Sequence, residues 1–119
     1  MSRHDDLVRL RHMHDYAAEA VEMAAGRTQG DLATDRMFLL ALTRLIEIVG
    51  EAATRISSTT QKAIPNIPWP EVIGMRNRIV HGYDRVHQGL LWNTIIEDLP
   101  PLIAVLEAAI ERLKSEGKE

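Results

Sequence analysis

The 119-residue sequence contains no cysteine, and aromatic residues make up only 4% of it. Without cysteine the chain cannot form disulfides or thiolate metal sites, so a reducing compartment is its simplest location. The first six residues lack the apolar core of a signal peptide, and no apolar run approaches the length of a bilayer span. We therefore expect a cytoplasmic protein that is not bound to a membrane.

What the sequence has in abundance is aliphatic side chains, which bring its hydrophobic content to 45%. A chain of this length is typical of one domain, and aliphatic residues pack well between helices. No strand-like alternation, internal repeat or low-complexity segment interrupts the pattern. We expect a single domain over residues 1–119, of which residues 115–119 form a frayed tail.

Helical periodicity divides the chain into a few long segments, with Gly26 and Pro65 marking two of the breaks. A polar stretch at residues 57–66 reads as a loop. Pro100 and Pro101 must kink or split the last helix, because proline removes a backbone donor. The predicted helices cover residues 5–25, 31–56 or 34–56, 70–80 and 87–114. The predicted fold class is therefore all-α, an antiparallel bundle of four helices, or five if the prolines break the last one.

Two aliphatic residues of the second predicted helix, Leu40 and Ile48, fall outside its main apolar stripe. They share a charged flank of the helix with Arg44 and Glu51, which suggests a second contact surface. A symmetric homodimer would use such a surface, because a two-fold interface presents the same patch twice. Scattered surface aliphatics are also normal in monomers, so the spacing alone leaves both interpretations open.

The residues with the clearest chemical character lie at 76–83, where the sequence is RNRIVHGY. Arg76 offers a planar fork of donors suited to phosphate, and His81 can gain or lose a proton near neutral pH. Together they can cut a phosphodiester, because one group moves protons while the other stabilises the negative charge that develops on phosphorus. The same residues also have a structural interpretation, in which Arg76 pairs with Glu47 or Glu51 and His81 bonds the last helix carbonyls.

On an ideal helix, the side chains of Arg76 and His81 point in directions about 140° apart. They can meet one phosphate only if the helix unwinds near Gly82, if the arginine side chain bridges the gap, or if two copies of the chain combine their residues. The residue pattern leaves these three arrangements open.

The motif resembles the signature of the HEPN ribonucleases, an arginine followed after four residues by a histidine. Tyr83, two residues after the histidine, resembles the longer form of the motif in the HepT toxins. The resemblance extends over residues 5–113 and is carried also by the tripeptides GEA at 50–52 and IPW at 67–69. It implies a HEPN helical bundle that forms a symmetric homodimer, with the paired motifs lining a cleft between the copies. It also implies a toxin of a type II or type VII toxin–antitoxin system, paired with a small antitoxin nucleotidyltransferase of the MntA type.

The resemblance also implies roles for the residues of the motif. His81 would act as acid and base, and Arg76 would neutralise the pentacoordinate phosphorus, in a metal-independent cleavage of RNA. The ribose 2′-hydroxyl would attack and leave 2′,3′-cyclic phosphate and 5′-hydroxyl ends, so DNA would resist. Asn77 would orient the imidazole or bond the phosphate, and Arg78 would be a further phosphate-binding residue. Tyr83 would receive AMP from the partner nucleotidyltransferase, which would block the cleft and repel RNA.

The net charge of −3 counts against tight independent binding of nucleic acid. Locally the sign changes, because Arg76, Arg78 and Arg85 all lie within residues 69–87. Two alternatives to the enzyme therefore stay open. The chain could be a non-catalytic helical scaffold that presents Tyr83 or a nucleotide to the nucleotidyltransferase, or a bundle whose motif serves stability alone.

The sequence offers little to a metal or a nucleotide cofactor. The spacing of its histidines and carboxylates does not resemble a metal site, and it contains no glycine-rich phosphate loop. We expect a protein without metal or cofactor.

Overall fold

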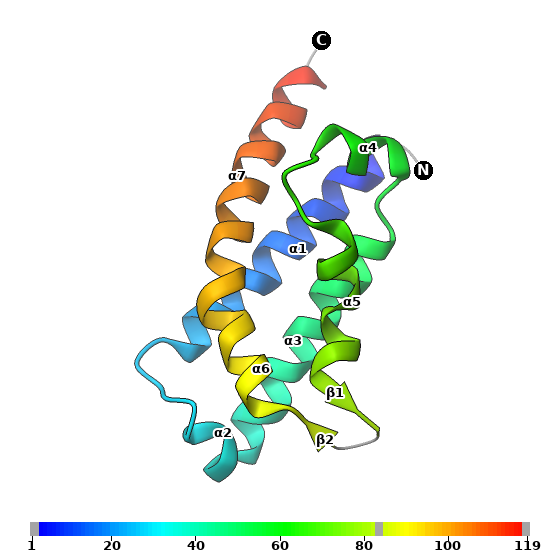
Figure 1. The fold of residues 1–119 in the computed structure, drawn as a ribbon. Helices are drawn as coiled ribbons and strands as arrows, with labels where there is room; N and C mark the ends of the chain where they lie inside the picture. The colour runs from blue at the N-terminus through cyan, green and yellow to red at the C-terminus, as the bar shows by residue number, and fades with distance from the viewer. Residues whose placement is uncertain (1–2, 83–84, 118–119) are drawn as a thin grey trace.

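Helices form nearly all of the computed structural model, which describes residues 3–82 and 85–117 (Figure 1). The first half contains α1 (Arg3–Ala24), α2 (Asp31–Thr34), α3 (Arg36–Thr54) and α4 (Ser58–Ala63). The second half contains α5 (Trp69–Ile79), β1 (Val80–His81), β2 (Arg85–Val86), α6 (Gln88–Asn93), a π-helical turn η1 (Thr94–Asp98) and α7 (Leu99–Glu116). The all-α prediction is confirmed, and within the described ranges two short strands are the exception.

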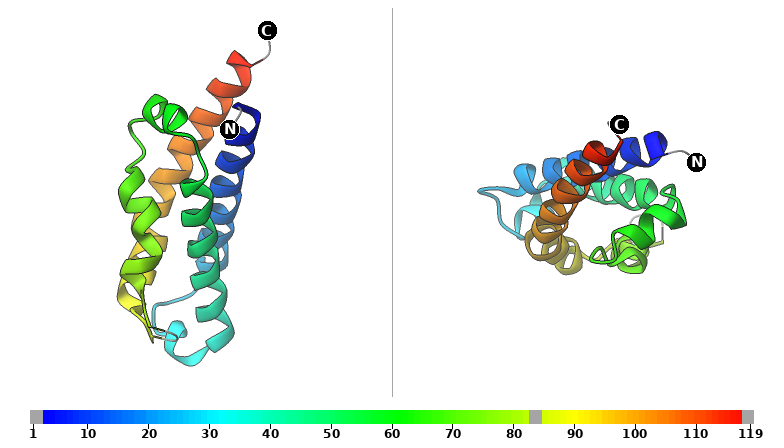
Figure 2. Two further views of the ribbon diagram at one scale, coloured as in Figure 1. Left: turned by 90° about the vertical axis from the view of Figure 1, so that its right-hand side faces the viewer. Right: turned by 90° about the horizontal axis from the view of Figure 1, so that it is seen from above.

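The long helices run antiparallel to one another along the length of the molecule, which measures 51 × 29 × 20 Å (Figure 2). α1 packs against α3 and α7, and α3 packs against α5. The apolar stripe predicted for the second helix is buried, from Phe38 through Leu42 and Val49 to Ile56. Together with apolar residues of α1 and α7 it forms one continuous core.

The predicted second helix is divided at Asp35, which ends α2 and caps α3. Asp35 has an extended backbone, and its carboxylate accepts a hydrogen bond from the N–H of Phe38 at 3.1 Å. An aspartate at this position satisfies a donor that the first helical turn leaves unpaired. Arg27 fixes the corner by pairing with Asp35 at 3.0 Å and with Asp31 at 3.2 Å. A continuous helix from Asp31 is therefore wrong, whereas the alternative start at Thr34 lies two residues from the observed start of α3.

Residues 57–66, predicted as a loop, contain the short helix α4. Ser57 caps its first turn through its side-chain hydroxyl. The indole N–H of Trp69 donates to the carbonyl oxygens of Gln61 at 3.0 Å and Ile64 at 3.1 Å, which ties this segment to the start of α5. The prediction misses α4 because this helix is stabilised by a cap and an indole hydrogen bond and has no apolar periodicity that the sequence would reveal.

The last helical stretch is interrupted, as predicted. The interruption is a π-helical turn that lies just before the two prolines. η1 ends at Asp98, and Pro100 and Pro101 lie in the first turn of α7, where a missing backbone donor costs least. α7 then continues to Glu116, two residues beyond the predicted end.

The helical segment at residues 88–116 is long and apolar enough to cross a membrane, judged by length and composition alone. The sequence expectation that no segment reaches this length is therefore wrong. Leu91, Leu99 and Leu106 are buried in the bundle core, whereas Leu90 and Ile96 are 40% and 47% exposed. The most apolar stretch of this segment is 33% buried in the bundle, and a helix that contributes to a protein core can pass the same test of length and composition.

α3 and α5 approach each other closely at Gly50. A Cβ atom at this position would lie 3.4 Å from the backbone oxygen of Val72 and 3.6 Å from that of Ile73. A methyl group would already be in contact with α5, so a larger side chain would push the two helices apart. Because α5 also carries Arg76, Gly50 helps to set the distance between that arginine and α3.

Asp6 is a charged side chain in the core, with 2% of its surface exposed. Its carboxylate accepts hydrogen bonds from the backbone N–H of Ser57 at 3.0 Å and from the hydroxyls of Ser57 and Thr60, both at 2.6 Å. Burial raises the pKa of Asp6, but these hydrogen bonds together outweigh it and hold the pKa below its ordinary value. The network ties the start of α1 to the cap of α4.

We expect Asp6→Asn to lower the free energy of unfolding by about 2 kcal/mol, because an amide cannot replace a charged acceptor of three hydrogen bonds. Since folding lowers the pKa of Asp6, its contribution is complete above about pH 4 and is lost as the pH falls through the folded-state pKa. Urea unfolding near neutral pH and in strong acid measures both effects. Glu19→Gln, which changes an exposed carboxylate of α1, is the control. Equal losses in the two variants, or a difference that persists in acid, would contradict the account.

Candidate active site

The end of α5 determines where the motif residues lie. The helix stops at Ile79, and Val80 takes an extended conformation with φ −105° and ψ 122°. Gly82 has φ +75°, a conformation that glycine adopts without strain. The helix thus unwinds before Gly82, as one of the three arrangements requires, and His81 lies on a strand.

The strands that follow form a tight antiparallel hairpin. Val80 pairs with Val86 and His81 pairs with Arg85. The N–H of His87 donates to the carbonyl oxygen of Ile79 at 2.7 Å and closes the hairpin against the helix end. The sequence reasoning missed this hairpin because two-residue strands have no periodicity to detect.

Arg76 lies on α5 beside a groove that separates α3 from the hairpin. Its Nε donates to Oε2 of Glu47 at 3.1 Å, and Glu47 is one of the partners that the structural interpretation predicts. The Arg76 side chain is still 46% exposed, so the guanidinium remains accessible to a ligand. We call this space of about 310 Å³ the Arg76 groove, and its walls also include Arg36, Leu39, Leu40, Arg44, Val80 and Val86.

His81 is exposed on the hairpin but faces away from the Arg76 groove. Neighbouring residues of a strand point to opposite faces, and Val80 is the one that lines the groove. His81 therefore lies on the other face beside its cross-strand partner Arg85, with Cβ atoms about 5 Å apart. One copy of the chain thus presents Arg76 and His81 on different faces at the same end of the bundle.

The other predicted site residues are not gathered around Arg76. Asn77 is exposed, and its expected alignment with His81 needs a continuous helix, whereas α5 ends between the two. Arg78 donates to the carbonyl oxygen of Glu71 at 2.9 Å and lines a different groove. Tyr83 lies outside the described residues.

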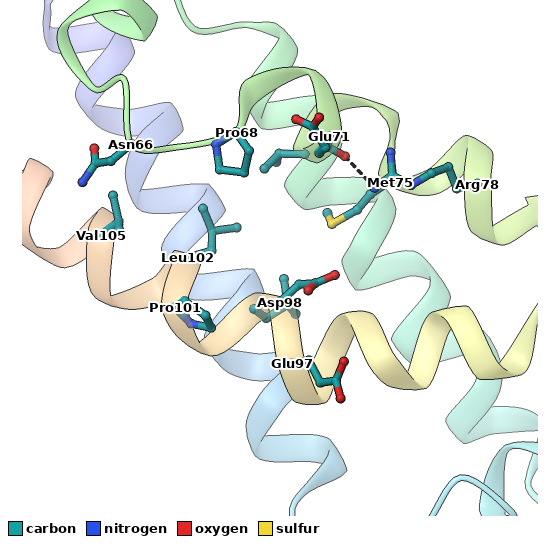
Figure 3. Close-up of a pocket in the computed structure, with 12 residues that line it drawn as sticks. Asn66, Pro68, Glu71, Met75, Arg78, Glu97, Asp98, Pro101, Leu102 and Val105 are labelled. Carbon is teal, nitrogen blue, oxygen red and sulfur yellow. Dashed lines mark hydrogen bonds between the residues drawn. The ribbon is translucent and has the colours of Figure 1, made fainter.

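The groove that holds Arg78 runs between α5 and the start of α7 and has a volume of about 640 Å³ (Figure 3). Its floor is apolar, and the carboxylates of Glu71, Glu97 and Asp98 lie among its walls. Three carboxylates against one arginine give this groove a negative potential, which disfavours phosphate. Arg78 is therefore in a poorer setting for a phosphate than Arg76.

Two arginines that the sequence reasoning did not select as site residues lie near the motif. Arg85 is the cross-strand partner of His81, and Arg36 lines the Arg76 groove. The available signal was the spacing of Arg36, Leu40 and Arg44 along one flank of α3. His87 caps α6, because its Nδ1 accepts a hydrogen bond from the N–H of Leu90 at 3.1 Å.

No group of three or more histidines and carboxylates within the described ranges is close enough to hold a metal ion. His12 and His14 have different partners. His12 packs edge-on against Tyr16, whereas His14 is hydrogen-bonded to Asp15 and Glu107, each at 2.9 Å. These two carboxylates raise the pKa of His14, and the bond to Glu107 links α1 to α7.

Comparison with known proteins finds a family whose members are similar to this chain. The model of the family described as ribonuclease HepT-like matches residues 13–109. A protein of Methanocaldococcus jannaschii with a provisional RNase name is 30% identical over 102 residues, which cover 86% of this chain and 94% of that protein. A protein of Thermococcus cleftensis, provisionally named ribonuclease HepT, is 36% identical over 89 residues, with coverages of 71% and 81%. No solved structure matches the chain significantly.

Proposed function

Because this chain belongs to the HepT-like ribonuclease family, we propose that it is a metal-independent endoribonuclease and the toxin of a toxin–antitoxin pair. Its substrate is RNA in the cytoplasm, and its partner is a nucleotidyltransferase antitoxin of the MntA type. The observation that carries the proposal is the setting of Arg76, an accessible guanidinium oriented by Glu47 in a groove beside the hairpin of His81.

The active form in this proposal is a symmetric homodimer. Met37 and Leu40 on α3 are 81% and 49% exposed, and Leu40 also lines the Arg76 groove. Exposed aliphatic residues beside a functional groove are typical of a contact surface. A two-fold pairing through this face of α3 would cover these residues and bring His81 of each copy to Arg76 of the other. This pairing overcomes the separation of the two side chains in one copy.

The proposed reaction is an internal transesterification of RNA. His81 takes the proton from the ribose 2′-hydroxyl, and the resulting oxygen attacks the adjacent phosphorus. Arg76 stabilises the added negative charge on the phosphoryl oxygens through its fork of donors. The bond from phosphorus to the 5′ oxygen breaks, that oxygen takes up a proton, and the products are a 2′,3′-cyclic phosphate and a 5′-hydroxyl. Asn77 is exposed one residue after Arg76 and can hydrogen-bond the phosphate.

Tyr83 is the proposed point of control. The partner enzyme would let the tyrosine oxygen attack the α-phosphorus of ATP, which transfers AMP to Tyr83 and releases pyrophosphate. In sequence Tyr83 stands between His81 and Arg85, so the added phosphate would bring negative charge next to the residues that meet RNA. Arg78 is a weaker candidate for holding that phosphate because of the carboxylates around it.

The non-catalytic alternative also has a specific observation in its favour. The ion pair of Arg76 with Glu47 is what a purely structural arginine would form, and the net charge of −3 does not favour RNA. The two readings differ in what removal of Arg76 does. An exposed ion pair contributes at most about 1 kcal/mol to stability, whereas a group that stabilises the transition state contributes far more to rate.

We expect Arg76→Ala and His81→Ala each to slow RNA cleavage by at least about 100-fold while the free energy of unfolding changes by less than about 1 kcal/mol. Single-turnover cleavage of a labelled RNA with a chelator present gives the rate, and mass spectrometry identifies the cyclic phosphate. Arg112→Ala, which removes another exposed ion-paired arginine, is the matched control and should cleave normally. Loss of folding in place of activity would favour the structural reading, and full activity in both variants would exclude the proposed mechanism.

We expect Tyr83→Phe to remain toxic in cells that also express the partner nucleotidyltransferase, because the variant has no hydroxyl to accept AMP. Intact-mass measurement should find one adenylyl group on the wild-type protein from the same cells and none on the variant. Neutralisation of the variant, or an adenylyl group at another residue, would remove Tyr83 from the control mechanism.

A further inference from the structure

A second groove adjoins the Arg76 groove at the end of the bundle that carries the hairpin. It has a volume of about 480 Å³, and Arg85 and Gln88 are among its walls. It shares Arg36, Leu39 and Val86 with the Arg76 groove. The two spaces are therefore neighbours, and we call them together the basic groove. The basic groove extends from Arg76 past Arg36 to Arg85.

The basic groove concentrates positive charge in a protein whose net charge is negative. Among the wall residues that the structure describes, Arg36, Arg44, Arg76 and Arg85 stand against one carboxylate, that of Glu47. The contrast with the groove on the other side of α5, where carboxylates outnumber the arginine, makes the local excess informative. A groove lined by one sign of charge attracts the opposite charge more strongly than an open surface does.

Some arginines of the basic groove form ion pairs with carboxylates of the protein, and others do not. Arg44 pairs with Glu51 at 3.2 Å, whereas Arg36 and Arg85 form no ion pair with any residue that the structure describes. Asp31 and Asp35, which precede Arg36 in the chain, are both paired with Arg27. Two exposed guanidinium groups are thus left to bind an external anion.

We propose that Arg36 and Arg85 bind the phosphate backbone of the RNA strand that flanks the scissile linkage, an inference that rests on the proposed ribonuclease function. The planar fork of arginine matches two phosphate oxygens at once. The wall residues that the structure describes are rich in guanidinium groups and include no aromatic side chain. The contact is therefore with phosphates, and it is tolerant of sequence.

The course of the groove explains why these two arginines are needed. One end is at Arg76, and the other is at Arg85, the cross-strand partner of His81. A strand lying in it extends from the phosphate held at Arg76 past Arg36 to Arg85 of the same copy, while His81 of the other copy reaches the phosphate at Arg76. Arg36, which lines both spaces, holds the strand between Arg76 and Arg85.

The test uses the His81→Ala protein, which keeps the groove and does not cut RNA. Anisotropy with a labelled single-stranded RNA over a range of salt concentrations gives the slope of log affinity against log salt. Each phosphate contact contributes about 0.7 to this slope for a single strand. We expect Arg36→Gln and Arg85→Gln each to reduce the slope by about 0.7, and Arg36→Lys and Arg85→Lys to restore it. Arg112→Gln removes the same charge from α7, away from the groove, and should leave the slope unchanged.

Several outcomes would overturn the inference. One is slopes for the Arg36 and Arg85 variants that equal that of the Arg112 control. Another is a slope that differs between U-rich and A-rich strands, which would indicate base contacts. A third is a lower oligomer mass with an unchanged slope, which would assign the groove to a protein interface.

The inference and the proposed function fail separately. If the wild-type protein cleaves RNA normally but the Arg36 and Arg85 variants leave the salt slope unchanged, the role proposed for the basic groove is wrong and the ribonuclease function stands. If the slopes change as expected but the wild-type protein does not cleave RNA, the groove binds the RNA backbone and the ribonuclease function is wrong.

Discussion

The end of α5 at Ile79 is the constraint on which the rest of this site depends. Three residues later Gly82 turns the chain through a left-handed conformation, and the strands pair at once. As a result Arg76 stays on a helix packed against α3, while His81 is carried by a hairpin that extends from the bundle. A helix continued through His81 would fix both side chains to one rod about 140° apart. The hairpin instead exposes His81 where a second molecule can approach it.

The sides of α5 differ in charge, and this difference gives each groove a separate character. Arg76 faces a space in which arginines exceed carboxylates, and Arg78 faces a space in which carboxylates exceed arginines. An overall charge of −3 conceals this separation. The adjoining basic groove extends the positive side toward Arg85, so the excess of positive charge lies at the end of the bundle that carries the hairpin.

The sequence predicted the elements that periodicity determines and missed those that single polar contacts determine. The long helices and the stripe from Phe38 to Ile56 follow from the spacing of apolar residues, and the structure confirms them. The break at Asp35 and the helix α4 depend on caps and on one indole donor, which leave no periodic signal. Asp6, buried with three hydrogen bonds, looks like an ordinary surface aspartate in the sequence. The motif selected Arg76 and His81 as candidates. Arg36 lies near Arg76 because segments distant in the chain pack together, and Arg85 lies beside His81 because two strands too short to show periodicity pair.

The claim at the centre of this account is that Arg76 of one copy and His81 of another act on one phosphate. Mixing Arg76→Ala and His81→Ala subunits tests it most directly, because neither homodimer has a complete pair of residues. If the pair forms across the dimer, mixed dimers regain one complete site, and cleavage returns to about a quarter of the wild-type rate when half of the dimers are mixed. Native mass spectrometry that detects mixed dimers without any recovery of cleavage would contradict the account.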